Sequence, residues 1–261
     1  MTFDIRRGIG TFGRLKNADP GFGDFAVVVP MYNEASGANA CVDRIGVELQ
    51  KFGDRPRLIA VNDGSTDGTR EILDALCVQN SRLVVIHKPV NEGYGAALRT
   101  GAERAAGLGF RYALFMDSDL TNNPADIEKF VSKMARGYDV IKASRFSAGG
   151  GMRGVPGNRA IVSRVGNTVA RALFRLKIRD MTNGFRAVRL QMLLQTPFAE
   201  RGFASIVEEL YQCKRLGASF AEVPVTLTSR TSERRATVFA YKPSIFFRYL
   251  KYCVLAFGVR K

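Results

Sequence analysis

The stretch Tyr112-Ala-Leu-Phe-Met-Asp117-Ser118-Asp119 indicates the fold class of this chain of 261 residues. Residues 112–116 form a short, continuous apolar run, which is typical of a strand that a parallel sheet buries on both faces. The strand ends where two carboxylates stand one residue apart. Because open α/β sheets bind ligands at the carboxyl edge of their strands, Asp117 and Asp119 are predicted to face a ligand. Two hard oxygen donors at this edge suit Mg²⁺ or Mn²⁺ held together with substrate phosphates.

Three similar strand–helix units precede this strand. They comprise predicted strands at 25–30, 57–61 and 83–86 and predicted helices at 38–52, 69–79 and 96–108. This alternation favours a parallel sheet with right-handed crossovers, in which the loops after the strands share one edge. Tyr32, Glu34 and Asp63 follow the first two strands, so we expect them at the same edge as Asp117.

The turn Asn91-Glu-Gly93-Tyr94-Gly95 precedes the third helix. A glycine-containing turn at the start of a helix lets the backbone approach a phosphate or a base closely. The spacing matches neither a dinucleotide fingerprint nor a P-loop. In the preceding unit, Thr66 and Asp67 have two possible roles. Either residue could contact a ligand, or it could cap the helix at 69–79.

The positive charge of the chain is confined to its second part. The net charge is +15, but residues 1–141 hold 17 basic and 18 acidic side chains, whereas residues 142–261 hold 22 and 6. This division predicts an anionic partner for the second part: nucleic acid, an anionic membrane surface or a phosphorylated substrate. No module typical of nucleic-acid binding is recognisable, which argues against the first of these partners.

The composition also argues against several kinds of site and segment. The four cysteines are scattered, which favours reduced thiols in the cytoplasm over disulfides or a zinc site. His87 is the only histidine, so we expect neither a Ser-His-Asp triad nor a multi-histidine metal site. Residues 1–24 lack the apolar core of a secretory signal, and no apolar run reaches the roughly 20 residues that cross a bilayer.

Two segments of the basic part are predicted to be amphipathic. After a strand at 139–143 and a glycine-rich loop, a long helix interleaves Arg159, Arg164 and Arg171 with apolar residues. Such a helix suits an anionic bilayer surface, and a solvated basic face on a packed helix is the alternative. Within residues 242–261, aromatic and aliphatic side chains surround Arg248 and Lys251. This pattern predicts an interfacial anchor or, alternatively, a packed terminal helix.

The ordered set of motifs between about residue 25 and residue 230 resembles glycosyltransferase family 2, and most closely its dolichyl- or polyprenyl-phosphate sugar transferases (dolichol-phosphate mannosyltransferase-like). The motifs are Val29-Pro30-Met-Tyr32-Asn33-Glu34, Asn62-Asp63-Gly64-Ser65-Thr66-Asp67-Gly68-Thr69, Asn91-Glu-Gly93-Tyr94-Gly95-Ala96, Met116-Asp117-Ser118-Asp119-Leu120, Ala143-Ser144-Arg145-Phe146, Asn158-Arg159-Ala-Ile-Val-Ser163-Arg-Val-Gly-Asn167, Asp180-Met-Thr-Asn-Gly184-Phe185-Arg186 and Glu222-Val-Pro224-Val225.

The resemblance implies an α/β fold of the GT-A type, a Rossmann-like doubly wound sheet with helices on both faces and amphipathic helices that face a membrane. It divides the chain into an N-terminal extension (1–24), a glycosyltransferase domain (25–230) and a basic amphipathic C-terminal tail (231–261). Within the domain, residues 25–141 would bind the nucleotide sugar and residues 142–230 the acceptor.

The resemblance also implies roles for single residues. The nucleotide sugar is expected to contact Pro30, Tyr32, Glu34, Asp63, Asn91, Gly93, Asp117, Ser118, Asp119 and Arg230. Asp117 and Asp119 would hold Mg²⁺ or Mn²⁺, and Arg145, Arg159 and Ser163 would bind the acceptor phosphate. Asp117, Asp119 and Arg145 are the predicted catalytic residues. The loop at 229–237 departs from the family pattern, because it lacks the glycine and the lysine of the Gly-x-Ser-Lys motif.

The implied reaction is transfer of a hexose, with inversion, from a GDP-mannose- or UDP-glucose-type donor to polyprenyl or dolichyl phosphate. The enzyme would be peripheral on the cytoplasmic, inner face of the membrane. A phosphate acceptor is already anionic, so it needs no general base. One alternative is a saccharide hydroxyl acceptor in envelope polysaccharide synthesis, with Glu208 or Glu209 as base unless these residues pair with an arginine. A non-catalytic membrane-associated binding protein is the other alternative, and the presence of Asp63, Asp117 and Asp119 argues against it.

Overall fold

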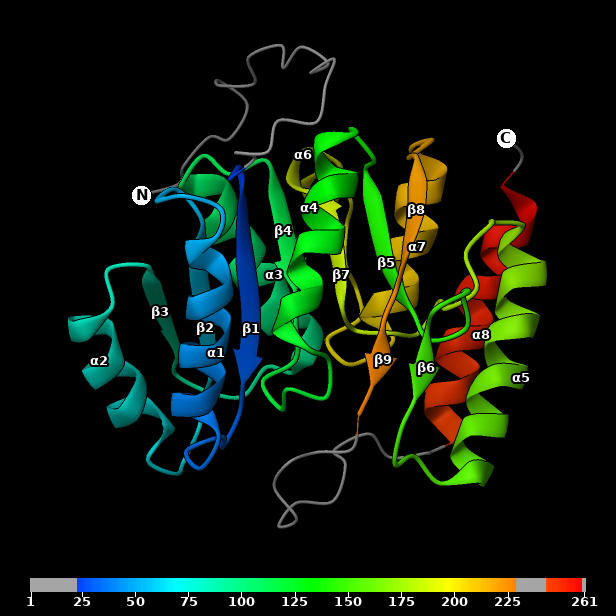
Figure 1. Cartoon of the computed structure of the whole chain (residues 1–261). Coiled ribbons are helices and arrows are strands. Elements are labelled where there is room, and N and C mark those ends of the chain that lie inside the picture. The colour runs from blue at the N-terminus through cyan, green and yellow to red at the C-terminus, as the bar shows by residue number, and fades with distance from the viewer. Residues whose placement is uncertain (1–22, 229–242, 260–261) are drawn as a thin grey trace.

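The computed structural model describes residues 23–228 and 243–259 of the chain. Within this part a large mixed sheet separates two layers of helices (Figure 1). Its strand order is β3-β2-β1-β4-β7-β5-β8. The strands are β1 (Phe25–Met31), β2 (Arg57–Asp63), β3 (Leu83–Lys88), β4 (Tyr112–Phe115), β5 (Val140–Ser144), β7 (Arg186–Arg189) and β8 (Phe220–Pro224). A separate parallel pair consists of β6 (Gly151–Met152) and β9 (Thr226–Leu227).

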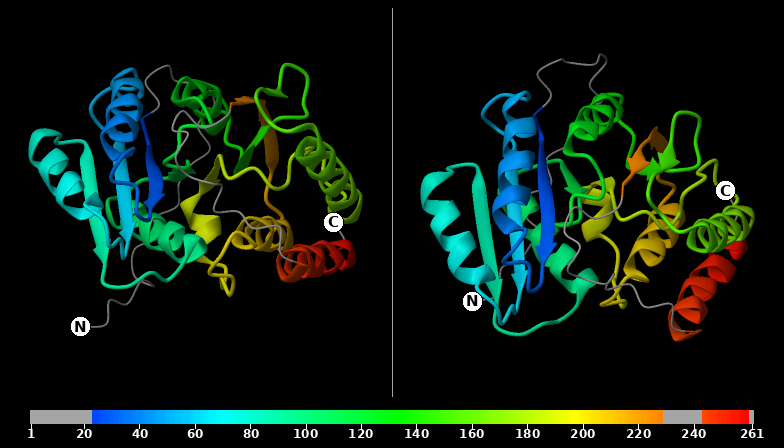
Figure 2. Two further views of the ribbon diagram at one scale, coloured as in Figure 1. Left: turned by 90° about the horizontal axis from the view of Figure 1, so that it is seen from below. Right: turned by 60° about the horizontal axis from the view of Figure 1, so that its bottom comes forward.

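The first four strands are parallel, as the repeated strand–helix units predict. β1 lies between β2 and β4, so that Val28 is opposite Ile59 on one side and Phe115 on the other. All four residues of β4 are buried, because helices cover both faces of the sheet. The loops that follow β1, β2, β3 and β4 therefore meet at one edge, which Figure 2 shows from below.

The sheet is not parallel throughout, and its antiparallel strand was not predicted. β7 lies between β4 and β5 and runs antiparallel to both. Arg186, its first residue, is opposite Phe115 on β4 and Lys142 on β5. Because β7 runs the opposite way, the segment that leads into it approaches the sheet at the carboxyl edge of its neighbours. This segment, residues 180–184, contributes to the site described below.

The helices form two layers, as expected for a doubly wound sheet. The layer with α1 (Ala38–Gln50), α2 (Thr69–Gln79) and α4 (Ile127–Ala135) packs on one face, and η1 (Pro124–Asp126) precedes α4. The other face is covered by α3 (Tyr94–Gly107), α6 (Leu190–Leu194) and α7 (Ser205–Arg215). α3 packs closely enough that a Cβ at Gly101 would lie 2.3 Å from Val28 Cγ1.

The two amphipathic segments form α5 (Gly157–Phe174) and α8 (Pro243–Gly258), which contact each other at one end of the sheet (Figures 1 and 2). α8 also packs on α7, and Tyr252, Cys253 and Ala256 belong to the same core cluster as α3 and α7. Lys214 Nζ donates to the carbonyl of Ala256 at 2.7 Å. One face of the tail helix is thus a packed face, and the other is exposed. Among the described helices, none combines the length and the hydropathy required to cross a membrane.

Candidate active site

The loops after β1 and β2 are joined by side chain–backbone hydrogen bonds. The amide of Asn33 donates to Ser65 Oγ at 2.8 Å, and the amide of Thr66 donates to Asn33 Oδ1 at 2.7 Å. The amide of Glu34 donates to Thr69 Oγ1 at 2.8 Å. Asn33 adopts a left-handed conformation (φ 56°), which asparagine tolerates better than most residues. These hydrogen bonds hold the loop that carries Tyr32 at the edge of the sheet, where this tyrosine is 45% exposed.

Asp63 joins the loops after β2 and β3. It lies at the predicted edge but is only 3% exposed, since its carboxylate accepts hydrogen bonds from the amides of Glu92 (3.1 Å) and Gly93 (2.8 Å). Lys88 Nζ lies 3.2 Å from the same carboxylate. Gly93 has a φ of 100°, and a Cβ there would lie 2.6 Å from the carbonyl oxygen of Arg201. The motifs around Asp63 and Gly93 therefore hold together the loops that follow β2 and β3.

Asp117 and Asp119 follow β4 at this edge, and each carboxylate is oriented by a hydrogen bond. Tyr94 OH donates to Asp117 Oδ1 at 3.0 Å. Asp119 Oδ1 accepts from the amide (3.1 Å) and the hydroxyl (2.8 Å) of Thr121. Ser118 stands between the two aspartates, and both aspartates are partly exposed.

Carboxylates from two different loops gather at this place. Burial raises the pKa of the Cys41 thiol to about 12, and the negative charges of Glu34, Asp119 and Asp117 contribute to the increase. Cys41 lies in the first turn of α1, so these three carboxylates face one region between α1 and β4. Glu34 and the two aspartates are thus all within electrostatic range of the Cys41 thiol. Pro30 lies near the carboxyl end of β1, opposite Val61 on β2.

The donor set fits a divalent cation that is shared with a diphosphate. Two carboxylate oxygen ligands from the protein, with phosphate oxygens completing the coordination, are typical of Mg²⁺ sites. No group of three or more His, Cys, Asp or Glu side chains suited to hold a metal occurs within residues 23–228 and 243–259. A metal at Asp117 and Asp119 would consequently need ligands from its substrate, as the sequence analysis expects.

Arg145, at the end of β5, is held by the segment 180–184. Its Nε and Nη2 donate to the two oxygens of Asp180 at 2.7 and 2.9 Å, and Nη2 also donates to Thr182 Oγ1 at 3.2 Å. Burial alone would raise the pKa of Asp180, but the hydrogen bonds and the charge of Arg145 outweigh burial and lower it. Asp180 therefore remains a carboxylate and fixes the plane of the guanidinium.

The same segment positions the acceptor residues expected on α5. Asn167 Nδ2 donates to Thr182 Oγ1 at 3.1 Å and to the carbonyl of Ser163 at 2.8 Å. Arg159 and Ser163 precede Asn167 by eight and four residues, so the three lie along one face of α5. The backbone of Ser163 is thereby connected to Arg145 through Asn167 and Thr182. Arg159 itself is exposed.

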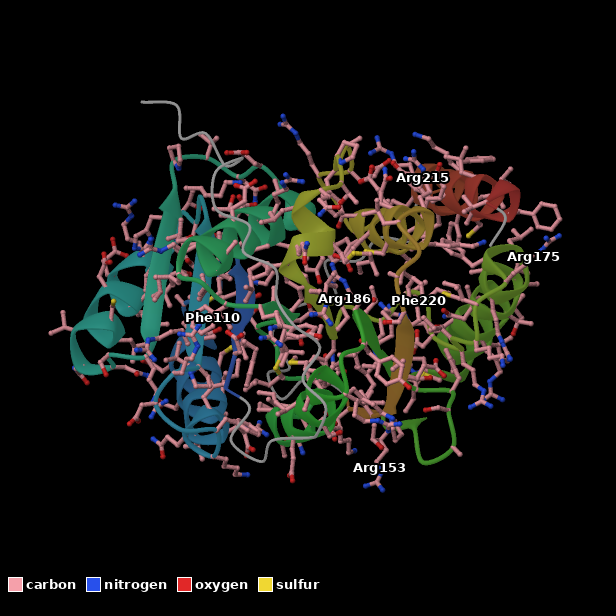
Figure 3. The ribbon with its side chains drawn as sticks, turned by 90° about the horizontal axis from the view of Figure 1, so that it is seen from above. Phe110, Arg153, Arg175, Arg186, Arg215 and Phe220 are labelled. Atoms are coloured by element: carbon pink, nitrogen blue, oxygen red, sulfur yellow. The ribbon has the colours of Figure 1, made fainter. Side chains whose placement is uncertain are left out.

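Two buried cations hold adjacent carbonyl groups of this segment. Lys142 Nζ donates to the carbonyl of Asn183 at 2.5 Å, and Arg186 Nη1 donates to the carbonyl of Gly184 at 2.9 Å. Arg186, which Figure 3 places near the centre of the molecule, is 1% exposed and binds both carboxylate oxygens of Glu209 at 2.6 and 2.8 Å. Burial lowers the pKa of Lys142 to about 7.

Glu208 and Glu209 both have structural roles. The pairing of Glu209 with an arginine is confirmed, and Glu208 accepts from the amides of residues 199 and 200 and from Tyr252 OH (3.0 Å). Both glutamates are 2% exposed. Neither is placed to deprotonate a substrate hydroxyl.

Sequence reasoning did not identify Tyr94, Lys142, Asp180 and Gly184 as contributors to the site. Tyr94, Asp180 and Gly184 lie within the motifs that carry the family resemblance, and this was the available signal. No feature of the sequence indicated a role for Lys142, because a lysine in a strand usually faces solvent. Asn91 is exposed in the loop after β3, where its backbone packs on Gly64. Arg230 and the loop at 229–237 lie outside the described residues.

Comparison with known proteins shows which family the sequence matches. Residues 26–195 match the model of glycosyl transferase family 2. A polyprenol monophosphomannose synthase of Mycolicibacterium smegmatis is 29% identical over 208 residues, which cover 78% of this chain and 77% of the relative. An undecaprenyl-phosphate mannosyltransferase of Micrococcus luteus is 26% identical over 206 residues, covering 78% and 83%.

Solved structures show the same fold. The crystal structure of glucosyl-3-phosphoglycerate synthase from Mycobacterium tuberculosis, in complex with Mn²⁺, UDP and glucosyl-3-phosphoglycerate, superposes with a TM-score of 0.65. The alignment covers 92% of this chain and 82% of that chain at 22% identity. At this identity the likeness is evidence for the fold alone.

Proposed function

We propose, from the premise that this chain belongs to glycosyl transferase family 2, that it transfers a hexose from a nucleotide sugar to polyprenyl phosphate. The chain is a glycosyltransferase, and its sheet is of the GT-A type. The donor is a GDP- or UDP-linked sugar, and the reaction proceeds with inversion at the anomeric carbon. The observation that carries the proposal is that segment 180–184 connects Asp117, at the donor edge, to Arg145 and α5.

On the donor side, the loops after β1, β2 and β3 provide a rigid frame for the nucleotide. Asp117 and Asp119 are the residues that would hold Mg²⁺ or Mn²⁺ against the diphosphate. When bound, the cation stabilises the negative charge of the departing nucleoside diphosphate. The chain's own contribution is to orient both carboxylates before the donor arrives, through Tyr94 and Thr121.

On the acceptor side, the phosphate itself is the nucleophile. Arg145 presents a guanidinium oriented by Asp180, and Arg159 and Ser163 line the face of α5 that Asn167 ties to Thr182. Nε and Nη2 of Arg145 already donate to Asp180 and Thr182, so Arg145 contributes chiefly its positive charge. Arg159 is the arginine that we expect to bind phosphate oxygens with two parallel hydrogen bonds. Because a phosphate monoester is already anionic at neutral pH, these residues need only bind and align it.

A phosphate acceptor fits the site better than a saccharide hydroxyl. A hydroxyl acceptor calls for a general base within hydrogen-bond reach. Glu208 and Glu209, the candidates that the sequence offered, are buried and bound to Tyr252 and Arg186. Two relatives act on lipid phosphates according to their names, which supports the same acceptor class for this chain.

We further propose that α5 and α8 bind an anionic membrane surface. α5 exposes Ile161 (65%), Val165 (58%) and other apolar side chains, and α8 exposes Phe247 (71%) and its apolar neighbours. Neither helix contains an acidic residue. Apolar side chains that insert at the interface, with basic ones that contact anionic headgroups, are the requirements for peripheral binding. We expect this surface to bind on the cytoplasmic side of the membrane.

The first test is sugar transfer from radiolabelled GDP- and UDP-sugars to undecaprenyl phosphate in the presence of Mg²⁺ or Mn²⁺. We expect label to move into the organic phase with one class of donor, and to stay in the aqueous phase when the metal is chelated. Asp119→Ala should reduce transfer by at least a hundredfold with an unchanged circular dichroism spectrum, because it removes one of two metal-holding carboxylates.

Two results would contradict the proposal. Turnover by Asp119→Ala equal to that of the wild type would exclude the metal role of this residue. Transfer to a saccharide hydroxyl, with none to undecaprenyl phosphate, would assign the chain to the alternative acceptor class.

A further inference from the structure

The carboxylate of Asp117 is enclosed by groups that sequence analysis did not assign. Tyr94 OH donates to Asp117 Oδ1, and the ring of Tyr94 stacks on Phe203 with centroids 4.7 Å apart and planes 27° from parallel. On its other side the backbone at Gly184 is so close that a Cβ there would lie 2.9 Å from Asp117 Oδ2 and 2.9 Å from Tyr94 OH. Asp117 is thus held between one hydroxyl and one backbone segment.

Arg186 supports both sides of this arrangement. Its Nη1 donates to the carbonyl of Gly184, which keeps the segment against Asp117 and Tyr94. Burial and the charge of Asp117 raise the pKa of the Tyr94 hydroxyl, and the nearby positive charge of Arg186 opposes this increase. Glu209 and the ring of Phe115, 4.6 Å from the guanidinium carbon, fix Arg186 in turn.

We propose that Tyr94 is a positioning residue that orients Asp117 for the divalent cation, and that Arg186 supports this arrangement by holding Gly184 against both side chains. The inference rests on the proposed function, since it takes Asp117 as a residue that holds the metal. Partners that hydrogen-bond a ligating carboxylate set its orientation, and their loss typically weakens metal affinity by about 10- to 100-fold. Tyr94 touches neither the sugar nor the acceptor in this role, so its effect is confined to metal affinity.

The test measures metal binding directly. Mn²⁺ is titrated into the full-length protein with saturating GDP and, separately, with saturating UDP, and free Mn²⁺ is followed by electron paramagnetic resonance. We expect Tyr94→Phe to raise the Kd for Mn²⁺ by about tenfold or more with the nucleotide that supports binding. The variant retains the ring that stacks on Phe203 and loses only the hydroxyl.

Tyr112→Phe is the matched control. Tyr112 is a fully buried tyrosine of β4 whose hydroxyl donates to the carbonyl of Tyr138 at 2.9 Å, far from the carboxyl edge. Both variants lose one tyrosine hydroxyl, and we expect a comparable fall in melting temperature. Only Tyr94→Phe should change the affinity for Mn²⁺. Binding of the nucleotide in the presence of a chelator should be the same in both variants.

The outcomes separate this inference from the proposed function. Wild-type binding of Mn²⁺ with an affinity that Tyr94→Phe changes less than twofold would overturn the inference and leave the function intact. Absence of Mn²⁺ binding by the wild type with either nucleotide would overturn both. Arg186→Lys keeps a cation beside Glu209 but lacks the fork that reaches Gly184, so we expect it to raise the Kd as well. An unchanged Kd in a folded Arg186→Lys would remove Arg186 from the proposal.

Discussion

At the scale of single residues, Lys142 differs most from what its residue type suggests. It is fully buried in β5, between β7 and β8, and its surroundings include Arg186, Asp180, Glu209 and Arg145. Burial disfavours the charged form and lowers the pKa to about 7, from 10.5 in an exposed lysine. A neutral amine still donates a hydrogen bond, so the contact with the carbonyl of Asn183 persists in both protonation states.

The pKa of Lys142 predicts a pH dependence of stability. Between about pH 7 and 10 the folded state has lost a proton that the unfolded state still binds, so the free energy of unfolding rises with pH. Below pH 7, Lys142 is charged in both the folded and the unfolded state. Burial of this charge then lowers the free energy of unfolding by its full amount. We expect the wild type to gain about 1 kcal/mol per pH unit between pH 7 and 9, relative to Lys142→Met. Urea unfolding at several pH values measures this difference.

An exposed lysine is the control for this experiment. Lys51 is exposed at the end of α1 and contacts only Glu48 among the described partners. Lys51→Met should leave the pH profile parallel to that of the wild type. Parallel profiles for the wild type and Lys142→Met would mean that Lys142 keeps an ordinary pKa.

At the scale of secondary-structure elements, α5 and α8 form one surface although about 70 residues separate them in the chain. Removing α8 would take Tyr252, Cys253 and Ala256 out of the core, so deletion cannot test membrane binding without disturbing the fold. Substitutions on the exposed faces avoid this problem. Arg175, at the end of α5, contacts the ring of Phe257 at 4.1 Å and marks the joined ends of both helices in Figure 3.

The proposed membrane surface predicts the effect of acidic substitutions. Ile161→Glu combined with Phe247→Glu should reduce co-sedimentation with vesicles that contain phosphatidylglycerol by at least tenfold, because it removes inserted apolar area and adds like charge. Val47→Glu with Val78→Glu, at apolar positions 57% and 89% exposed on α1 and α2, should have no effect. Equal binding by both double variants would contradict the assignment, as would equal binding to vesicles of phosphatidylcholine alone.

At the scale of the whole molecule, the two differently charged parts of the sequence contribute different elements to the structure. The neutral part provides β1 to β4 and the carboxylates at their carboxyl edge. The basic part provides α5, α8 and the segment 180–184. The two parts share one sheet, because β7 pairs with β4 on one side and β5 on the other. Under the proposed function, we expect a change in one part to weaken the binding of one substrate more than that of the other.

This division predicts a selective effect of Arg159→Ala. Loss of one charge-assisted hydrogen bond costs about 1.5–3 kcal/mol, so the KM for undecaprenyl phosphate should rise by about tenfold or more. Affinity for the nucleotide donor should stay within twofold. Arg171→Ala, about 18 Å further along the same helix, is the control of equal charge. Parallel losses of donor and acceptor binding in Arg159→Ala would place this residue elsewhere than at the acceptor.

The sequence alone determined the parallel part of the fold and placed Asp117 and Asp119 at the carboxyl edge of its strands. Apolar runs that end in polar residues mark β1 to β4, since strands buried on both faces tolerate few polar side chains. Asp117 and Asp119 could be placed because they directly follow such a run. The basic and apolar pattern of α5 was equally readable, because helical periodicity depends only on local spacing.

Only the tertiary structure decided how the neutral and the basic parts of the chain are connected. β7 is four residues long and antiparallel, and a strand so short has no periodicity that reveals its direction or neighbours. Its insertion brings Arg186 beside Phe115 and Lys142, and Gly184 against Asp117. These contacts join residues up to 71 positions apart in the chain. Buried hydrogen bonds and ion pairs between such distant residues depend on strand pairing, which local sequence does not specify.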